Sequence, residues 1–374
     1  MNQTKSDVKK VLVIGTSFYP ENSPRSFRTT ELVKELCRQG HDVTLYTIKD
    51  NQHHPAIEEE FGVKIKDLGK RKFHMLNIQS GPKILVWPKR IINRALQQLF
   101  EDPSIELMFK VKKALKKENN SYDLLISIAV PYPNHWGTAW ARTKKNNIAK
   151  VWVADCGDPY MGAIYDSFKK FFYFKYLEKG FCKKADYIAI TKMSMKENYY
   201  PEFHSKIIEI PQGFKFEKLN SDNSGHNPIP TFAFAGSLLP IGRNPSQLLT
   251  FLSTVDKPFK FIIYTRNQNL ATPFKEALGD KLEIRDYIPR NELLKVLSQM
   301  DFLVNIAFDP VHQSPSKLID YYILGKPIMS STTSEFDTNM VLEFLEGNYT
   351  QQFKISNPEQ YRIESVVQQF INLC

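Results

Sequence analysis

The sequence predicts an α/β protein made of two doubly wound domains. The first half opens with a short apolar run at 11–14, a helical pattern at 27–38 and a second apolar run at 42–47, which is a strand, helix, strand order. The same order begins again at Thr231. A stretch rich in Asn, Ser, Gly and Pro, at 220–230, separates the two series and is typical of a linker.

The length of 374 residues is sufficient for two domains that each have their own core. We place these domains at residues 1–212 and 213–357, and a C-terminal helix at 358–374. The composition, 42% hydrophobic and 13% aromatic, is that of a folded globular protein. A net charge of +10 favours anionic partners and does not distinguish nucleotides, anionic membranes and nucleic acid.

The cysteines and the apolar runs predict the compartment. Four cysteines lack paired or metal-ligand spacing, which favours a reducing setting: Cys37, Cys156, Cys182 and Cys374. The first ten residues leave no room for the apolar core of a signal peptide, and no apolar run approaches the roughly 20 residues that span a bilayer. We expect a cytoplasmic protein, with peripheral contact to the inner face of the plasma membrane as a further option.

Two arginines stand where a doubly wound sheet binds its ligands, beyond the end of its first strand. Arg25 and Arg28 follow a loop that holds Pro20 and Pro24, at the start of the first helix. They are candidates for an acceptor or phosphate contact. Solvated cations at a helix start explain them equally well.

A histidine and two aspartates follow later strands of the first half. His135 lies between a strand predicted at 123–128 and a helix predicted at 136–144. A neutral imidazole there can hydrogen-bond a sugar hydroxyl or a developing charge, although a capping histidine is the simpler interpretation. Asp155 and Asp158 follow the strand at 151–154 and can accept hydrogen bonds from acceptor hydroxyls, while helix capping explains Asp155 equally well.

A basic and apolar stretch occupies residues 64–117. It contains Ile84–Trp87, Pro88–Arg90 and an amphipathic segment at 91–100. Basic residues beside Trp, Ile and Leu suit a helix that lies at an anionic membrane, and a solvated positive face is the alternative. The aromatic helix predicted around 171–182 similarly belongs either to the core or to a membrane-facing surface.

The second half contains a turn suited to phosphate binding. Strands are predicted at 231–235, 259–265, 283–288 and 302–308, and helices at 245–252 and 291–300. The turn after the first of these strands holds Gly236, Ser237 and Arg243. Glycine lets a ligand approach the backbone closely, and a guanidinium can bind a diphosphate through several donors.

The functional centre is predicted at residues 314–327, with the sequence SPSKLIDYYILGKP. Ser314 suits a helix N-cap, Pro315 suits the first helical position, and Gly325 ends the helix. Ser316, Lys317 and Asp320 then share one helix face. Helix amides and Lys317 would bind phosphates and Asp320 a ribose diol, whereas an ordinary capped helix with a solvated ion pair is the alternative.

This segment resembles the PSKLxEYxxxGKP signature of glycosyltransferase family 4, whose members are retaining, metal-independent enzymes of GT-B fold. Asp320 matches the second of the two Glu residues of the family, and His312 stands at the position of the first. The resemblance implies two Rossmann-like domains that face each other across a cleft. It also implies that the C-terminal helix crosses back onto the first domain.

Further segments resemble the family in the same order. Residues 17–43, SFYPENSPRSFRTTELVKELCRQGHDV, resemble its opening, with 23–26 in place of a Gly-Gly pair. His135 matches the histidine of PPxxxH, beside the donor sugar, and Asp158 matches the Asp of an RDPW-like turn. Arg243 matches a Lys of the family's phosphate turn, where Ser237 replaces an Arg.

The resemblance therefore predicts a transferase that moves a sugar from a nucleotide-sugar, with a UDP-sugar favoured, to a glycan or lipid-linked acceptor in cell-envelope polysaccharide synthesis. The catalytic candidates are His135 and Asp158, and the acceptor or phosphate candidates are Arg25, Arg28 and Asp155. The donor candidates lie in the second half: Gly236, Ser237, Arg243, Thr265, Tyr287, Ile288, Ser314, Ser316, Lys317, Leu318 and Asp320. No two Asp residues are separated by a single residue, so we expect no metal cofactor, and phosphate charge neutralised by Arg243, Lys317 and helix amides.

Three other functions stay open at this stage. A GT-B sugar-nucleotide 2-epimerase would share the fold, and would act on the donor without an acceptor. A nucleotide- or glycan-binding protein without turnover is compatible with His312 and Ser237. Nucleic-acid binding is a weaker third, because the sequence contains no recognised reader module.

Overall fold

The computed structural model describes residues 7–78, 83–119, 121–163, 169–216, 227–240, 242–307, 316–332 and 336–374, with the backbone alone at 83–85 and 316. The chain forms two compact units. Unit 1 comprises Met1–Lys215 and Gln360–Cys374, and unit 2 comprises Phe216–Glu359. Each unit has a parallel sheet and a core of its own.

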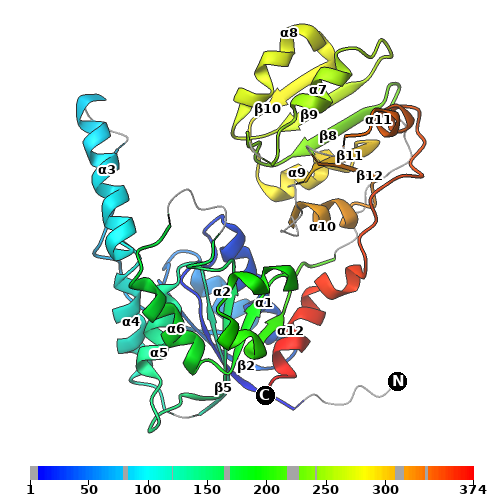
Figure 1. The fold of residues 1–374 in the computed structure, drawn as a ribbon. Coiled ribbons are helices and arrows are strands. Elements are labelled where there is room, and N and C mark those ends of the chain that lie inside the picture. The colour runs from blue at the N-terminus through cyan, green and yellow to red at the C-terminus, as the bar shows by residue number, and fades with distance from the viewer. Residues whose placement is uncertain are drawn as a thin grey trace, which may run out of the picture. The chain divides into compact units, whose positions relative to one another are not determined.

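Unit 1 is built on a seven-stranded parallel sheet with the order β3-β2-β1-β4-β5-β6-β7 (Figure 1). The order reverses between β1 and β4, so the carboxyl ends of these two strands form a topological switch point, where doubly wound sheets bind ligands. The strands are β1 (Lys10–Ile14), β2 (Asp42–Thr47), β3 (Lys64–Asp67), β4 (Tyr122–Ile128), β5 (Ala149–Gly157), β6 (Tyr187–Ile190) and β7 (Ile207–Glu209).

Helices cover both faces of this sheet, which explains why its strands are continuous apolar runs. Val11 and Val13 of β1 point into a cluster with α1 and α12, while Leu12 and Ile14 point into one with α4, α5 and α6. The helices are α1 (Pro24–Arg38), α2 (His54–Phe61), α3 (Lys83–Phe100), α4 (Glu106–Leu115), α5 (Pro133–Ala141), α6 (Phe174–Lys184) and α12 (Ile363–Ile371). Short 3-10 turns occupy Met193–Asn198, Pro201–Lys206 and Pro358–Tyr361.

The C-terminal helix belongs to unit 1, as the resemblance implied. Phe370 of α12 is fully buried in the same cluster as Leu32 and Leu36 of α1, and the two helices lie side by side (Figure 1). The chain leaves and re-enters unit 1 at adjacent points. Phe214 donates its N–H to the carbonyl of Tyr361 at 2.8 Å and accepts from the N–H of Ile363 at 2.9 Å.

Unit 2 repeats the arrangement with five parallel strands in the order β10-β9-β8-β11-β12. Its switch point lies between β8 and β11. The strands are β8 (Thr231–Ala235), β9 (Lys260–Tyr264), β10 (Leu282–Arg285), β11 (Phe302–Ile306) and β12 (Ile328–Ser331). The helices are α7 (Ser246–Leu252), α8 (Lys275–Leu278), α9 (Arg290–Leu297), α10 (Ser316–Ile323) and α11 (Thr338–Leu345), with 3-10 turns at Gln268–Leu270, Thr272–Phe274 and Gly279–Lys281.

The boundaries of β5, α5 and β10 differ from the predictions and move candidate residues. Strand β10 ends at Arg285, so Tyr287 and Ile288 follow it and are not part of it. Strand β5 continues to Gly157, three residues beyond its predicted end, because β4 and β6 both pair with it there through Ile128 and Ala189. Asp155 is therefore inside a strand and not in a loop. Helix α5 begins at Pro133, so His135 is in its first turn and does not precede it.

Candidate functional site

The switch point of the unit 2 sheet brings a glycine and a lysine together. Gly236 directly follows β8, has a φ of +143° and donates its N–H to the carbonyl of Tyr264 at 3.0 Å. A Cβ at Gly236 would lie 3.9 Å from Cδ of Lys317 and 3.7 Å from the ring of Phe234. The positive φ favours glycine here, and the absent side chain leaves the backbone open beside Lys317.

Lys317 presents a buried cation at this point. It lies in the first turn of α10, and its Nζ is 4.1 Å from the ring centroid of Phe234. Within the described residues this buried Nζ has no hydrogen-bond partner. Burial, together with the nearby charge of Arg243, holds the pKa of Lys317 well below its usual value. A bound anion would oppose both effects, because it would supply the hydrogen bonds and the negative charge that the ammonium lacks.

Asp320 is held by an arginine that the sequence analysis did not select. Arg290, at the start of α9, donates from Nε to Oδ1 of Asp320 at 3.0 Å and from Nη2 to the same oxygen. Burial raises the pKa of Asp320, and Arg290 opposes that shift. A contact of Asp320 with a ribose stays a prediction. Arg290 could have been selected from the sequence, because an Arg at the start of a helix faces the carboxyl edge of the sheet.

The other donor candidates divide into surface and core positions. Gly236 and Ser237 are exposed, and the ring of Tyr287 lies 4.2 Å from the guanidinium of Arg266. The hydroxyl of Thr265 accepts from the N–H of Asn267 at 3.2 Å. Leu318 is buried in the apolar cluster against which Ile288 packs. Ser314 and His312 lie outside the described residues, as does the side chain of Ser316.

The switch point of unit 1 opens into a cavity of about 900 Å³. Residues after three strand ends line it: 16–21 after β1, 47–50 after β2, and 130–131 after β4. Ser23, Arg25, His54, Arg71 and Ser104 complete the lining. Of these five, Arg25 alone was a candidate from the sequence, since the distant segments that carry His54, Arg71 and Ser104 give no local signal of their convergence.

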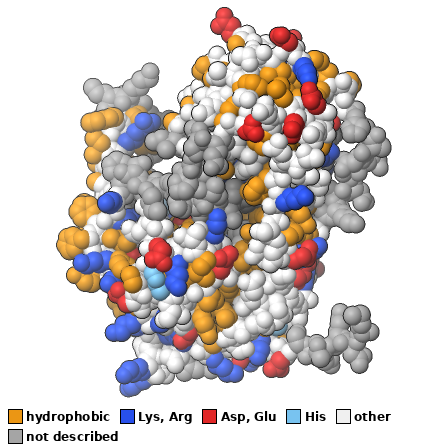
Figure 2. Space-filling model, turned by 45° about the vertical axis from the view of Figure 1, so that its right-hand side comes forward, with side chains coloured by type: hydrophobic (Ala, Val, Ile, Leu, Met, Phe, Trp, Pro, Cys, Tyr) orange, Lys and Arg blue, Asp and Glu red, His pale blue; other side chains and the backbone are white. Residues whose placement is uncertain are grey.

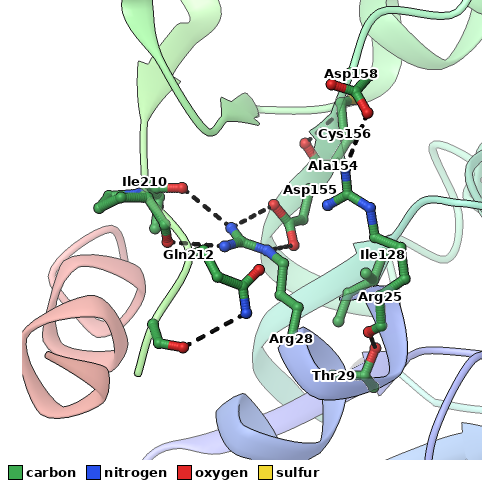
Figure 3. Close-up of polar contacts among 12 residues, drawn as sticks. Arg25, Arg28, Thr29, Ile128, Ala154, Asp155, Cys156, Asp158, Ile210 and Gln212 are labelled. Carbon is green, nitrogen blue, oxygen red and sulfur yellow. Dashed lines mark hydrogen bonds and ion pairs between the residues drawn. The ribbon is translucent and has the colours of Figure 1, made fainter. Parts of the chain in front are cut away.

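Arg28 is an internal residue of unit 1. Its Nε and Nη2 donate to the two carboxylate oxygens of Asp155 at 2.5 and 2.7 Å, and Nη1 and Nη2 donate to the carbonyls of Pro211 and Ile210 at 2.8 and 3.1 Å (Figure 3). Arg28 is 3% exposed and Asp155 is 0% exposed. The pair therefore joins α1, β5 and the segment after β7, and neither side chain lines the cavity.

Arg25 and Asp158 approach each other at the edge of this arrangement, 3.8 Å apart (Figure 3). Gly157, between the two aspartates, has a φ of +72°, and a Cβ there would lie 1.5 Å from Nη2 of Arg25. The absence of a side chain at Gly157 thus makes room for the guanidinium. The Asp158 side chain is 58% exposed, so the structure leaves it accessible to a ligand.

His135 lies in the core. Its ring is 0% exposed, with Nδ1 2.7 Å from the Ser127 hydroxyl and Nε2 3.6 Å from the Cys156 sulfur. Burial lowers its pKa to about 3, so the imidazole is neutral near pH 7. The predicted neutral state fits this value. The predicted contact with a sugar stays a prediction, and in this structure solvent does not reach the ring.

In the described residues, no three or more His, Cys, Asp or Glu side chains gather in a way that could hold a metal ion. Among the described helices, none combines the length and the apolar character required to cross a bilayer.

Comparisons with known proteins give structural matches alone. No protein-family model and no curated protein matches the sequence. The solved structure of TarM matches with a TM-score of 0.61 and 10% identity, over 99% of both chains. HepE from Anabaena, in complex with UDP-glucose, matches with a TM-score of 0.58 and 10% identity, over 98% of this chain and 99% of its own. The lipopolysaccharide outer core galactosyltransferase WaaB matches with a TM-score of 0.53 and 13% identity, over 97% and 98%.

The chain has the GT-B fold. The two parallel sheets and the nearly complete coverage confirm the fold class that the sequence predicted. At 10 to 13% identity these matches establish the fold and leave the activity to be argued from the site.

Loss of one partner of the Arg28–Asp155 pair should destabilise unit 1. Asp155→Ala should lower the free energy of unfolding by about 3 to 5 kcal/mol, because it leaves a buried guanidinium without its counter-charge. Arg28→Met combined with Asp155→Leu should cost less than Asp155→Ala, since no buried charge remains. Urea unfolding measures both. Glu202→Ala, which breaks the exposed Lys179–Glu202 pair, is the control and should cost less than about 1 kcal/mol.

His135 should make the fold sensitive to acid. Its pKa rises from about 3 in the folded state to about 6.5 on unfolding, so the unfolded chain takes up a proton and stability falls as the pH drops below 6.5. From pH 7 to pH 5 this contribution is roughly 2 kcal/mol. Burial raises the pKa of Glu178 from 4.5 to about 7, so Glu178 gives a contribution of opposite sign over the same range.

The two contributions are separable by substitution. Between pH 7 and pH 5, His135→Gln should lose roughly 2 kcal/mol less stability than the wild type, and Glu178→Gln roughly 2 kcal/mol more. Urea titrations at the two pH values test this. Two variants that shift in the same direction would contradict the assignment.

Proposed function

We propose that the protein is a retaining glycosyltransferase of family 4 type, which uses a nucleotide-sugar donor, with a UDP-sugar favoured. One observation carries this proposal: the buried ammonium of Lys317 lies close enough to Arg243 for its pKa to be lowered, at the switch point of the unit 2 sheet. Two neighbouring cations at the start of a helix suit a diphosphate. The UDP-glucose named with HepE, which has the same fold, gives further support.

The chemistry would take place around the leaving diphosphate. The bond between the anomeric carbon and the diphosphate oxygen breaks, and the acceptor hydroxyl oxygen forms a new bond to that carbon. The hydroxyl proton passes to the leaving phosphate, on the same face of the sugar, so the configuration is retained. Negative charge grows on the diphosphate in this step, and Lys317, Arg243 and the start of α10 would stabilise it without a metal ion.

The roles of the two domains follow the same proposal. Residues 213–357 would bind the donor, and residues 1–212 would bind a glycan or lipid-linked acceptor through the unit 1 cavity and Asp158. WaaB, a lipopolysaccharide outer core galactosyltransferase with the same fold, supports a role in cell-envelope polysaccharide synthesis. Four free cysteines support a cytoplasmic setting.

Helix α3 supports peripheral contact with an anionic membrane. None of its described side chains is buried, and Figure 1 shows it extending beyond the helices that cover the unit 1 sheet. Trp87 is 70% exposed, and Ile91 and Ile92 are each 47% exposed. Figure 2 shows hydrophobic and basic side chains next to one another along its left-hand edge, where α3 lies. No Asp or Glu occurs from residue 68 to residue 100, which suits anionic lipid headgroups.

Donor binding is the test of the proposed site. Lys317→Ala and Arg243→Ala should each weaken UDP binding by about 1.5 to 3 kcal/mol, because each removes a charge-assisted contact. Isothermal titration calorimetry with UDP measures the change. Lys295→Ala removes an exposed lysine of α9 in the same unit and should leave the affinity unchanged. Unchanged affinity in both test variants would refute the site.

An activity assay with a UDP-sugar distinguishes a transferase from an epimerase and from a binding protein without turnover. The wild type should transfer or slowly hydrolyse the sugar of a UDP-sugar in the presence of EDTA, with retained configuration by NMR. Loss of activity with EDTA would contradict the metal-independent mechanism. Formation of an epimerised UDP-sugar without acceptor would identify an epimerase instead.

Membrane contact should depend on the exposed apolar face of α3. The combined substitution Trp87→Ser and Ile91→Ser should reduce binding to phosphatidylglycerol vesicles at least about tenfold, because it removes two large apolar side chains from the interface. Co-sedimentation measures this binding, with phosphatidylcholine vesicles as the uncharged comparison. Equal binding of the variant and the wild type would place the contact elsewhere.

A further inference from the structure

An apolar groove lies beside α3 in unit 1, with a volume of about 390 Å³. Side chains from two helices, α3 and α6, and from the segments that connect them to their neighbours line it. They are almost all apolar and include Phe73, Leu96, Leu99, Phe100, Phe174 and Leu177. Asp102 also lines it. A groove of this kind can hold a hydrocarbon chain, and the proposed function so far leaves it without a role.

Specific hydrogen bonds hold the walls of the groove in place. Glu106 of α4 accepts from the N–H groups of Lys72 and Phe73 at 2.7 and 2.9 Å, which fixes the backbone at Phe73. Asn93 of α3 donates to the carbonyl of Leu76 and accepts from its N–H, both at 2.9 Å. These hydrogen bonds attach the segment 72–76 to both α3 and α4. The fold itself therefore fixes this wall of the groove.

The groove adjoins the polar cavity at the switch point. Arg71 and Ser104 line the cavity, whereas Phe73 and Ile105, one or two residues away in sequence, line the groove. Both stretches of chain therefore pass from one site directly into the other. The cavity side carries three cations, Arg25, Lys49 and Arg71, and two carboxylates, Glu21 and Asp50, while the groove side carries mostly apolar residues. A polar or anionic head with a hydrocarbon tail is the kind of molecule that suits both.

We propose that the acceptor is a lipid-linked glycan carrier with a phosphate at its head, whose hydrocarbon chain lies in this groove while its head lies in the cavity. The exposed face of α3 runs on from the groove at Phe100, which is 57% exposed, and gives the chain a route from a membrane. This inference rests on the proposed function, because it names the class of acceptor that the transferase would use.

The affinity for simple amphiphiles tests the groove without the natural acceptor. Monomeric n-alkyl phosphates of four, six, eight and ten carbons should bind the full chain more tightly with each added methylene, by about two- to fourfold per group. Isothermal titration calorimetry measures these affinities. Phe100→Ser should flatten the dependence on chain length, and Arg71→Gln should weaken all chain lengths by a similar factor, about tenfold.

The control is Phe353→Ser, which removes another exposed phenyl ring, 42% exposed, from unit 2 and should change nothing. An affinity that does not grow with chain length would overturn the proposal. So would a chain-length dependence that Phe100→Ser leaves intact, or one that Phe353→Ser reduces equally.

UDP binding, measured on the same variants, separates this inference from the proposed function. Phe100→Ser should bind UDP as the wild type does. If the wild type binds no UDP but shows the chain-length dependence, the proposed function fails and the lipid groove stands. If UDP binds and chain length has no effect, the lipid-linked acceptor is the part that fails.

Discussion

The ion pair between Arg28 and Asp155 is the contact on which the geometry of unit 1 depends. It places two charges where solvent does not reach, and the guanidinium of Arg28 donates four hydrogen bonds to two other parts of the chain, Asp155 and the segment 210–211. Arg28 also fixes the start of α1, and with it the loop from β1 that lines the cavity. Removal of one partner would leave an isolated buried charge, so these parts of the chain are coupled energetically as well as sterically.

The buried cations beside the two sheets differ in their partners. In the described part of unit 1, the buried cation Arg28 is satisfied within the protein, and the neighbouring Arg25 faces Asp158. In unit 2 the ammonium of Lys317 is buried against an aromatic ring and lies near a second cation. The first arrangement stabilises the fold, whereas the second carries an electrostatic cost that a bound anion would relieve. The switch point of a parallel sheet therefore holds a cavity beside an internally paired cation in unit 1. In unit 2 it holds two neighbouring cations at a site suited to a bound anion.

Much of the fold could be predicted from the sequence, because strands buried on both faces appear as short apolar runs between turn residues. The runs at 11–14, 42–47 and 231–235 coincide with β1, β2 and β8 to within one residue. Gly236 and Lys317 could be selected because they follow strand ends, and the structure brings them together.

Long-range pairing explains what the sequence analysis missed. Asp155 resembled a loop residue, since nothing in its neighbours reveals that β4 and β6 extend β5 past it. Arg290 is 30 residues from Asp320, and Arg71 reaches the cavity from the segment after β3. Likewise, the burial of His135 follows from Ser127 and Cys156 on neighbouring strands, which its own helix does not indicate.

The two crossings between the units have a consequence for how the chain is organised. Because Phe214 bonds to both Tyr361 and Ile363, the departing and returning backbones are already bridged as neighbouring strands would be. Unit 2 is thus an insertion whose ends are fixed next to each other. A peptide of a few residues could close that gap. The first Rossmann-like domain and its C-terminal helix therefore form a topologically complete body. Evolution could exchange the inserted domain without changing the strand order of the first domain.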